Sequence, residues 1–218
     1  MMVSLIDKFK TLLTFDFKTL SALLSQKYSG YLVDVGWFNS FKSKTAVDKN
    51  NNPILWMTYP FSDFIKDRLN NSLTVFEFGS GNSTLYLSKM VRNVISVEHN
   101  KQWYNRLVKT LPDNVEVIYR DVAENESYEK SCLEFNKSYD IIFVDGQKRN
   151  ECISHGIKAL SNNGIIILDD SERSEYRDGI KLLEENYFKR IDFWGIAPGI
   201  LFKKCTTIFY KSHNCLGI

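Results

Sequence analysis

A glycine-rich loop that contains an acidic residue carries the clearest chemistry in the sequence. The segment that closes an apolar run reads Glu77-Phe78-Gly79-Ser80-Gly81-Asn82-Ser83-Thr84. Gly79 and Gly81 allow a tight turn and a close approach of a ligand to the backbone. The polar residues that follow can begin a helix, and they offer hydroxyl or amide groups to a ligand. Such a loop after a strand and before a helix predicts a nucleotide-type binding site.

A second acidic residue fits the same kind of site. Glu98 ends the apolar run Val94–Val97 and follows Gly79 by 19 residues. An acid at the end of the next strand of a doubly wound sheet can bind the hydroxyls of a ribose. A carboxylate that only caps a helix or faces solvent is the alternative. The loop and the acid together favour the ribose site over that alternative.

The charge of Glu77 distinguishes between two cofactor classes. A carboxylate two residues before the first glycine would repel a pyrophosphate, but it suits a cationic ammonium or sulfonium. The loop also lacks the third glycine of the dinucleotide fingerprint, since Thr84 stands in its place. The sequence therefore favours a sulfonium cofactor over a dinucleotide.

Three further acids follow two later apolar runs, and they are Asp145, Asp169 and Asp170. Clustered carboxylates repel one another unless a positive charge neutralises them. A divalent cation such as Mg²⁺, which prefers oxygen ligands, is one solution. The other solution needs no metal and uses the nearby basic residues Lys148, Arg149 and Arg173. The metal is the less favoured of the two.

The elements that must position these residues alternate along the chain. Short runs rich in Val and Ile predict buried strands at Thr74–Phe78, Val94–Val97, Val115–Tyr119, Ile141–Val144 and Ile165–Leu168. Helix-length segments separate them, a pattern typical of a parallel sheet with helices on both faces. Two last strands, Ile191–Trp194 and Thr206–Tyr210, have no helix between them and are expected to be antiparallel. We expect an α/β fold with a Rossmann-like, doubly wound, mostly parallel seven-stranded sheet.

These motifs resemble the class I S-adenosylmethionine-dependent methyltransferases over residues 60–210. Glu77-x-Gly79-x-Gly81-x-Ser83 is similar to the glycine motif of that family, although Ser83 replaces the usual third glycine. The segments Tyr139–Gly146 and Asn163–Asp170 are similar to the motifs of its fourth and fifth strands. The resemblance implies S-adenosyl-L-methionine as cofactor. The cofactor-binding residues that it implies are Glu77, Gly79, Ser80, Gly81, Asn82, Ser83, Thr84, Glu98, His99, Asp121, Val122 and Asp145.

A narrower similarity, to the catechol-type magnesium-dependent O-methyltransferases, implies a catalytic set. Those enzymes have an Asp at the place of Asp145, a basic Lys three residues later and an Asp-Asn pair after the fifth strand. The corresponding residues here are Asp145, Lys148, Asp169 and Asp170, with Asp170 in place of the Asn. Asp145 has a second possible role, which is to bind the amine of the cofactor. Helix capping by the Asp pair and solvent exposure of Lys148 are the alternatives without catalysis.

The charge distribution divides the chain at residue 72. Residues 1–71 have a net charge of +3 and lack Glu, whereas the remainder has a net charge of −1. We expect an N-terminal helical and irregular cap, residues 1–71, on a cofactor-binding core, residues 72–218. Apolar residues recur in the cap at helical spacing: Val3, Ile6, Phe9, Leu12, Leu13, Phe17, Leu20, Leu23 and Leu24. The aromatic residues among them are expected to face the core rather than a membrane.

Composition narrows the acceptor and the compartment. The 218 residues are 44% hydrophobic and carry a net charge of only +2, which is typical of a globular protein and gives no reason to expect nucleic-acid binding. The chain lacks the tetrapeptide of amino-methylating DNA enzymes and a Pro-Cys pair. We therefore expect no DNA partner, but an oxygen acceptor on a small molecule or a glycan. No C-x-x-C pair, secretory signal or transmembrane run is present, so we expect a cytoplasmic protein with reduced thiols. The oligomeric state does not follow from the sequence.

The leading hypothesis is a methyltransferase that uses S-adenosylmethionine. The first alternative is an NAD(P)-dependent oxidoreductase on a similar sheet, against which Glu77 and Thr84 count. The second is a methyltransferase-like protein that binds the cofactor or a partner without turnover.

Overall fold

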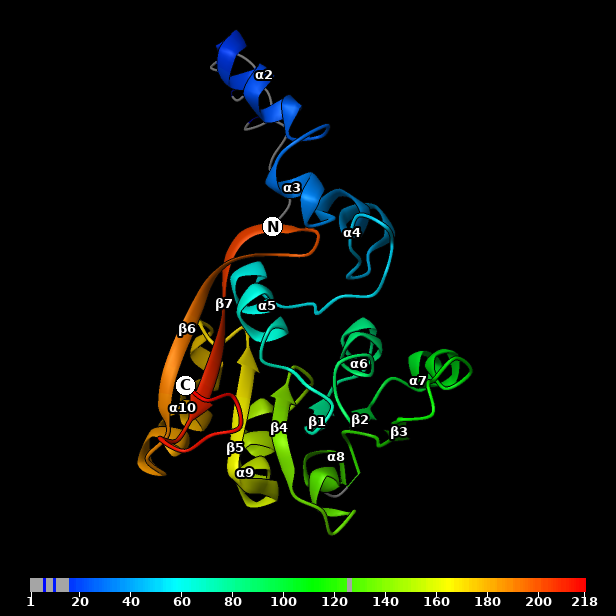
Figure 1. The fold of residues 1–218 in the computed structure, drawn as a ribbon, viewed down its shortest axis with the longest axis vertical. Coiled ribbons are helices and arrows are strands. Elements are labelled where there is room, and N and C mark those ends of the chain that lie inside the picture. The colour runs from blue at the N-terminus through cyan, green and yellow to red at the C-terminus, as the bar shows by residue number, and fades with distance from the viewer. Residues whose placement is uncertain (1–5, 7–9, 11–15, 125–126) are drawn as a thin grey trace.

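A computed structural model describes residues 6, 10, 16–124 and 127–218 of the chain (Figure 1). Five of its strands form a parallel set and two form a hairpin at one edge of the same sheet. The strands are β1 (Thr74–Phe78), β2 (Asn93–Glu98), β3 (Val115–Tyr119), β4 (Tyr139–Val144), β5 (Leu160–Asp169), β6 (Lys189–Ala197) and β7 (Ile200–Tyr210). Their order is β3-β2-β1-β4-β5-β7-β6, and β7 runs antiparallel to β5 and β6. The predicted fold class is confirmed.

The strand order reverses between β1 and β4. The chain runs outward from β1 to β3, and it then returns to place β4 on the other side of β1. Ligands of open α/β sheets bind in the crevice outside the carboxyl ends of the strands at such a reversal. The residues that follow β1 and β4 are Gly79 and Asp145. The topology therefore brings two of the predicted motifs to the same edge of the sheet.

Strand alternation divides the core into two layers. Phe76, Phe78 and Ile142 point to one face, where they pack with Cys152 and Ile153. The helices on that face include α9 (Arg149–Ala159) and α10 (Arg177–Glu185). Both faces of the parallel strands are buried, which explains why these strands read as continuous apolar runs.

The opposite face carries the second layer. Val75, Ile141 and Phe143 pack there with Phe61 and Ile65 of α5 (Tyr59–Lys66). The Phe61 ring makes edge contacts with Phe143 and Phe193. Shorter helices complete the core: α6 (Asn82–Leu87), α7 (Lys101–Leu107), α8 (Ser127–Lys130) and the 3₁₀ turns Ser131–Leu133 and Ser174–Tyr176.

Within residues 16–58, the N-terminal region contains the helices α2 (Phe17–Ser25), α3 (Tyr31–Asp34) and α4 (Trp37–Ser43), which precede α5. Figure 1 shows α2 standing away from the sheet. None of its residues is buried, and Phe17 is 84% exposed. The expectation that Phe17 faces the core is therefore wrong, because the helix projects beyond the layer that could cover it. The earlier apolar positions Val3, Phe9, Leu12 and Leu13 lie outside the described residues.

The rest of the N-terminal region contacts the core. The Trp37 indole of α4 donates to the Ile200 carbonyl at 3.1 Å, and α5 packs into the sheet as described above. The separation of a cap at residue 72 stays a prediction. Within the described part of the chain, no helix combines the length and the apolar character needed to span a membrane.

Two phenylalanines of the N-terminal region, one in a buried helix and one in an exposed helix, test this division. We expect Phe61→Ala to lower the free energy of unfolding by about 3–5 kcal/mol, since it leaves a cavity between two rings. We expect the exposed Phe17→Ala to change the same quantity by less than about 0.5 kcal/mol. Urea denaturation followed by circular dichroism measures both. Equal losses in the two variants would contradict the arrangement.

Candidate functional site

A pocket of about 390 Å³ lies outside the carboxyl ends of β1, β2 and β4. Of the twelve predicted cofactor-binding residues, its lining contains Gly79, Ser80, Gly81, Asn82, Ser83, Glu98, His99 and Asp145. Its volume lies within the range of small-molecule and cofactor sites. The structure therefore brings eight of these residues, from three separate strand ends, to one cavity.

Glycines allow two strand ends to approach each other beside this pocket. Gly79 has φ +94°, a conformation that other residues rarely adopt, and a β-carbon there would lie 3.2 Å from the Gly146 α-carbon. A β-carbon on Gly146 would lie 1.9 Å from the hydroxyl oxygen of the buried Tyr128. The Asp145 amide also donates to the Phe78 carbonyl at 3.1 Å. The close contact between the two loops thus depends on both glycines.

Glu77 supports the loop from beneath. Its side chain is buried, and Thr84 Oγ1 donates to its Oε2 at 2.5 Å. The same Thr84 oxygen accepts the Gly81 amide at 2.9 Å, so this residue closes the loop where dinucleotide sites have a glycine. Burial raises the pKa of Glu77 to about 7, and hydrogen bonds from Ser83 and Thr84 oppose the rise.

Glu98 organises the side of the pocket next to β2. Its Oε2 accepts the Ser80 amide at 3.2 Å and the Ser80 hydroxyl at 2.9 Å. Its Oε1 accepts the Asn100 amide at 2.6 Å and lies 3.3 Å from His99 Nδ1. The carboxylate therefore links the glycine loop to the start of α7. Its Ser80 hydroxyl contact is one that a ligand hydroxyl can replace.

Arg149 holds the opposite side of the pocket. Its Nη2 donates to Asp145 Oδ1 at 3.0 Å, and its Nε donates to the Gly146 carbonyl at 3.0 Å. Its Nη1 donates to the carbonyl of Asp169 at the end of β5. Burial and the Asp169 carboxylate raise the pKa of Asp145, while Arg149 opposes the rise. The guanidinium thus joins the ends of β4 and β5 while Asp145 stays open to the cavity.

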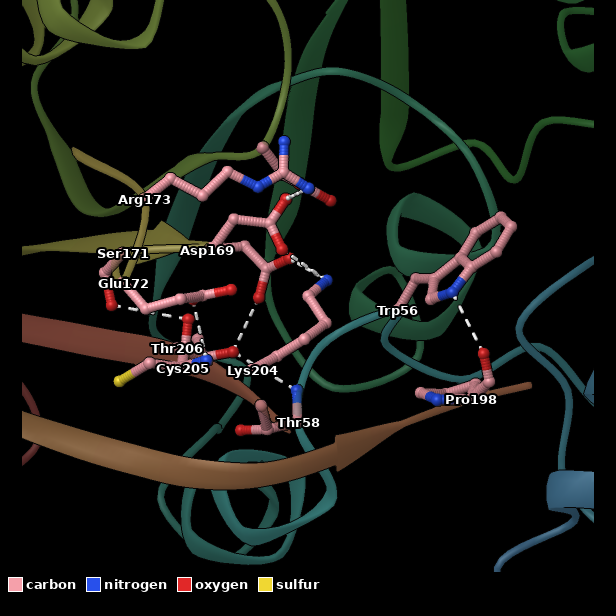
Figure 2. Close-up of polar contacts among 12 residues, drawn as sticks. Trp56, Thr58, Asp169, Ser171, Glu172, Arg173, Pro198, Lys204, Cys205 and Thr206 are labelled. Atoms are coloured by element: carbon pink, nitrogen blue, oxygen red, sulfur yellow. Dashed lines mark hydrogen bonds and ion pairs between the residues drawn. The ribbon is translucent and has the colours of Figure 1, made fainter. Parts of the chain in front are cut away.

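Asp169 and Asp170 are both buried, and neither lines the pocket. Figure 2 shows Asp169 directed toward Lys204 and Thr206. Neighbours in a strand point to opposite faces, but Asp170 has φ +52° and leaves the strand. Both carboxylates therefore reach the Lys204 ammonium, at 3.0 Å from Asp169 Oδ2 and 2.6 Å from Asp170 Oδ1. Arg173 Nη2 lies 2.8 Å from Asp170 Oδ2, and the Thr206 hydroxyl donates to Asp169 Oδ1 at 2.6 Å.

Lys148, Asp121 and Val122 do not line this pocket. Lys148 Nζ lies 3.0 Å from Oε1 of the buried Glu129. Asp121 Oδ1 accepts the Ala123 amide at 2.9 Å, and Val122 packs against the core. Their cofactor and catalytic roles stay predictions.

Several residues of the pocket were not selected from the sequence. The lining includes Lys44, Thr45, Ala46, Trp103, Gly146 and Gln147. The Trp103 indole donates to the Ser80 carbonyl at 2.8 Å, and the Asn82 amide group donates to the Ala46 carbonyl at 2.8 Å. These contacts join distant segments, so sequence spacing carries no signal for them.

Trp56 forms part of the rim between the N-terminal region and the β6–β7 loop. Its side chain is 41% exposed, and its indole donates to the Pro198 carbonyl at 3.1 Å (Figure 2). The next three residues, Met57–Tyr59, are buried in the core. The stretch Trp56–Tyr59 therefore consists of one pocket residue followed by a packing segment.

Comparison with known proteins agrees with this site. Residues 76–171 match the family described as a methyltransferase domain. That match contains the glycine loop, Glu98 and the three acids, and it confirms the resemblance to class I methyltransferases. No curated protein matches the chain.

Several solved structures share the fold. Precorrin-6y C5,15-methyltransferase from Geobacter metallireducens is 17% identical with a TM-score of 0.53, over 79% of this chain and 96% of that chain. A Staphylococcus aureus protein provisionally described as a caffeoyl-CoA O-methyltransferase is 16% identical with a TM-score of 0.55, over 89% and 98%. A Streptococcus mutans protein with a provisional methyltransferase assignment, solved with SAH, is 13% identical with a TM-score of 0.50, over 70% and 97%. At these identities the likeness shows the shared fold.

The raised pKa of Glu77 leads to a pH-dependent stability. A carboxyl with a pKa of about 7 in the folded state and 4.5 in the unfolded state stabilises the fold below pH 4.5 and loses this contribution as the pH rises through 7. Between pH 5 and 8 we expect the wild type to lose about 2–3 kcal/mol more unfolding free energy than Glu77→Gln.

Denaturant titrations at both pH values measure this difference. The matched control is Glu116→Gln, on the exposed part of β3, which we expect to follow the wild type. Parallel pH profiles for the wild type and Glu77→Gln would contradict the raised pKa.

Proposed function

Because residues 76–171 match a methyltransferase domain and the pocket lies at the strand reversal, we propose that the chain transfers a methyl group from S-adenosyl-L-methionine. The observation that carries the proposal is the joint presence of the Gly79–Gly81 loop, Glu98 and Asp145 in one cavity. Carboxylates at two sides of a glycine-framed pocket suit a ligand that has hydroxyl groups and a positive charge. A dinucleotide would place a negative pyrophosphate close to the buried Glu77.

The residues present fit the cofactor in chemical type. Glu98 would bind the ribose, with a ribose hydroxyl taking the place of the Ser80 hydroxyl at its Oε2. The glycine loop provides backbone groups without side-chain obstruction, and Trp103 fixes that loop through the Ser80 carbonyl. When bound, the cofactor supplies a methyl group on a positively charged sulfur.

We further propose an oxygen acceptor on a small molecule or a glycan. Asp145 is an acid of the cavity lining on the side opposite Glu98, and its raised pKa suits a group that accepts a proton near neutral pH. Its role is to take the proton of an acceptor hydroxyl, while Arg149 keeps its carboxylate oriented. Trp56 at the rim offers a ring face against which a planar or sugar acceptor can pack.

Lys148 has a supporting role in this proposal. Its ammonium lies 3.0 Å from Glu129 Oε1, and this ion pair compensates the buried carboxylate of α8. The pairing holds the ammonium at Glu129, and Lys148 does not line the pocket. Asp145 is therefore the proposed proton acceptor.

Cofactor binding tests the proposal first. Isothermal titration calorimetry with S-adenosylhomocysteine is expected to show one site per chain. Glu98→Gln is expected to weaken this binding about 10- to 100-fold, since a charged hydrogen-bond acceptor is lost. The exposed Glu116→Gln is expected to bind like the wild type. Absence of binding by a folded sample, or tight binding of NAD instead, would overturn the proposal.

Turnover separates an enzyme from an inactive binding protein. A screen with methyl-labelled cofactor and a library of hydroxylated small molecules and glycans is expected to find a methylated acceptor. On that acceptor, Asp145→Asn is expected to lower kcat about 100- to 10,000-fold. Cofactor binding without transfer to any acceptor would favour the hypothesis of a methyltransferase-like binding protein without turnover. Unchanged turnover in Asp145→Asn would exclude this residue as the proton acceptor.

A further inference from the structure

Lys204 places a positive charge inside the cluster of carboxylates behind the pocket. Strand β7 exposes Lys203, whose ammonium lies 4.3 Å from the centre of the Trp194 ring, and turns Lys204 inward. Lys204 is only 5% exposed. Figure 2 shows its side chain pointing toward Asp169 at the end of β5. Its ammonium lies 3.0 Å from Asp169 Oδ2 and 2.6 Å from Asp170 Oδ1.

The acids around this ammonium have the arrangement of a cation site. One carboxylate oxygen from each of Asp145, Asp169 and Asp170 lies within 4.8 Å of the others. Oxygen ligands of a divalent cation are spaced on this scale, because each lies about 2.0–2.6 Å from the ion. Such a cluster could therefore hold Mg²⁺ or Mn²⁺ if its oxygens were available.

The oxygens are already compensated by the chain itself. Arg149 Nη2 lies 3.0 Å from Asp145 Oδ1, and Arg173 Nη2 lies 2.8 Å from Asp170 Oδ2. With Lys204, three cationic side chains face three carboxylates. The Thr206 hydroxyl donates to the second oxygen of Asp169 at 2.6 Å. A divalent ion would therefore have to displace existing contacts, and a buried ammonium beside it would repel it.

We propose that the Lys204 ammonium occupies the place of a divalent cation and makes the site independent of metal. The three acids alone suggest a metal site, but together with their basic partners the residues present do not fit a metal. Lys204 acts as a positioning residue. It fixes Asp169 and Asp170, and Arg149 transmits that position to Asp145 through the Asp169 carbonyl and the Asp145 carboxylate.

The inference about the cation does not depend on methyl transfer, although its consequence for Asp145 rests on the proposed function. A measurement of metal binding therefore tests it separately. If S-adenosylhomocysteine fails to bind while the metal results below are obtained, the proposed function fails and this inference stands. The reverse pattern would overturn only the inference.

Electron paramagnetic resonance of free Mn²⁺ provides the test. The wild type, Lys204→Met and Lys203→Met are treated with EDTA, exchanged into metal-free buffer and titrated with Mn²⁺. Lys204→Met keeps a long side chain but removes the charge. We expect it to bind one Mn²⁺ at least about tenfold more tightly than the wild type, which should show no stoichiometric binding below about 1 mM. The exposed Lys203→Met is the matched control and should behave like the wild type.

Thermal unfolding gives a second readout. If Lys204 had only a structural role, Mn²⁺ would not change the Tm of Lys204→Met. Unpaired buried carboxylates destabilise Lys204→Met, so Mn²⁺ is expected to raise its Tm while leaving the Tm of the wild type unchanged. A folded Lys204→Met that does not bind Mn²⁺ would overturn the proposal. If that variant does not fold, the wild type still decides. Stoichiometric Mn²⁺ binding below about 1 mM that Asp170→Asn abolishes would overturn the proposal, and its absence would support it.

Discussion

Compensation of buried negative charge at the carboxyl edge of the sheet is the constraint on which the site depends. An unpaired buried carboxylate lowers the free energy of unfolding, on the order of 3–5 kcal/mol when one partner of a buried pair is removed. Each buried acid therefore requires a fixed cation or a set of hydrogen-bond donors. Arg149 meets part of this requirement and also binds the carbonyl groups of Gly146 and Asp169. The same interaction that neutralises Asp145 therefore sets the spacing between the ends of β4 and β5.

A parallel solution operates at the end of β1, without a cation. Thr84 donates to the buried Glu77 and accepts the Gly81 amide, so one hydroxyl joins the carboxyl group to the loop above it. The positive φ of Gly79 then brings this loop against Gly146. The two sides of the pocket are thus built on the same need to satisfy buried polar groups, and the space between them is the cavity.

The fold and the glycine side of the site were predictable because their signals are local. Strands β1 and β3 have the predicted bounds, and the strand reversal follows from the alternation of strands and helices. Gly79, Glu98 and Asp145 could be selected because each follows a predicted strand. The spacing rules that predict a helix face do not say whether a layer lies opposite it, and α2 is exposed for that reason.

The partners of the acids and the far wall of the pocket could not be predicted in the same way. Lys204 reaches Asp169 across 35 residues, and its position depends on the antiparallel register that pairs Thr206 with Asp169. The contact between Asn82 and the Ala46 carbonyl likewise depends on where the N-terminal region packs.

A crystal structure of the chain grown with S-adenosylhomocysteine would test whether the pocket beside the glycine loop is the cofactor site. We expect the ligand beside the Gly79–Gly81 loop, with a ribose hydroxyl within hydrogen-bond distance of the Glu98 carboxylate. S-adenosylhomocysteine bound elsewhere on the chain, or no ligand beside the Gly79–Gly81 loop at saturating concentration, would contradict this placement.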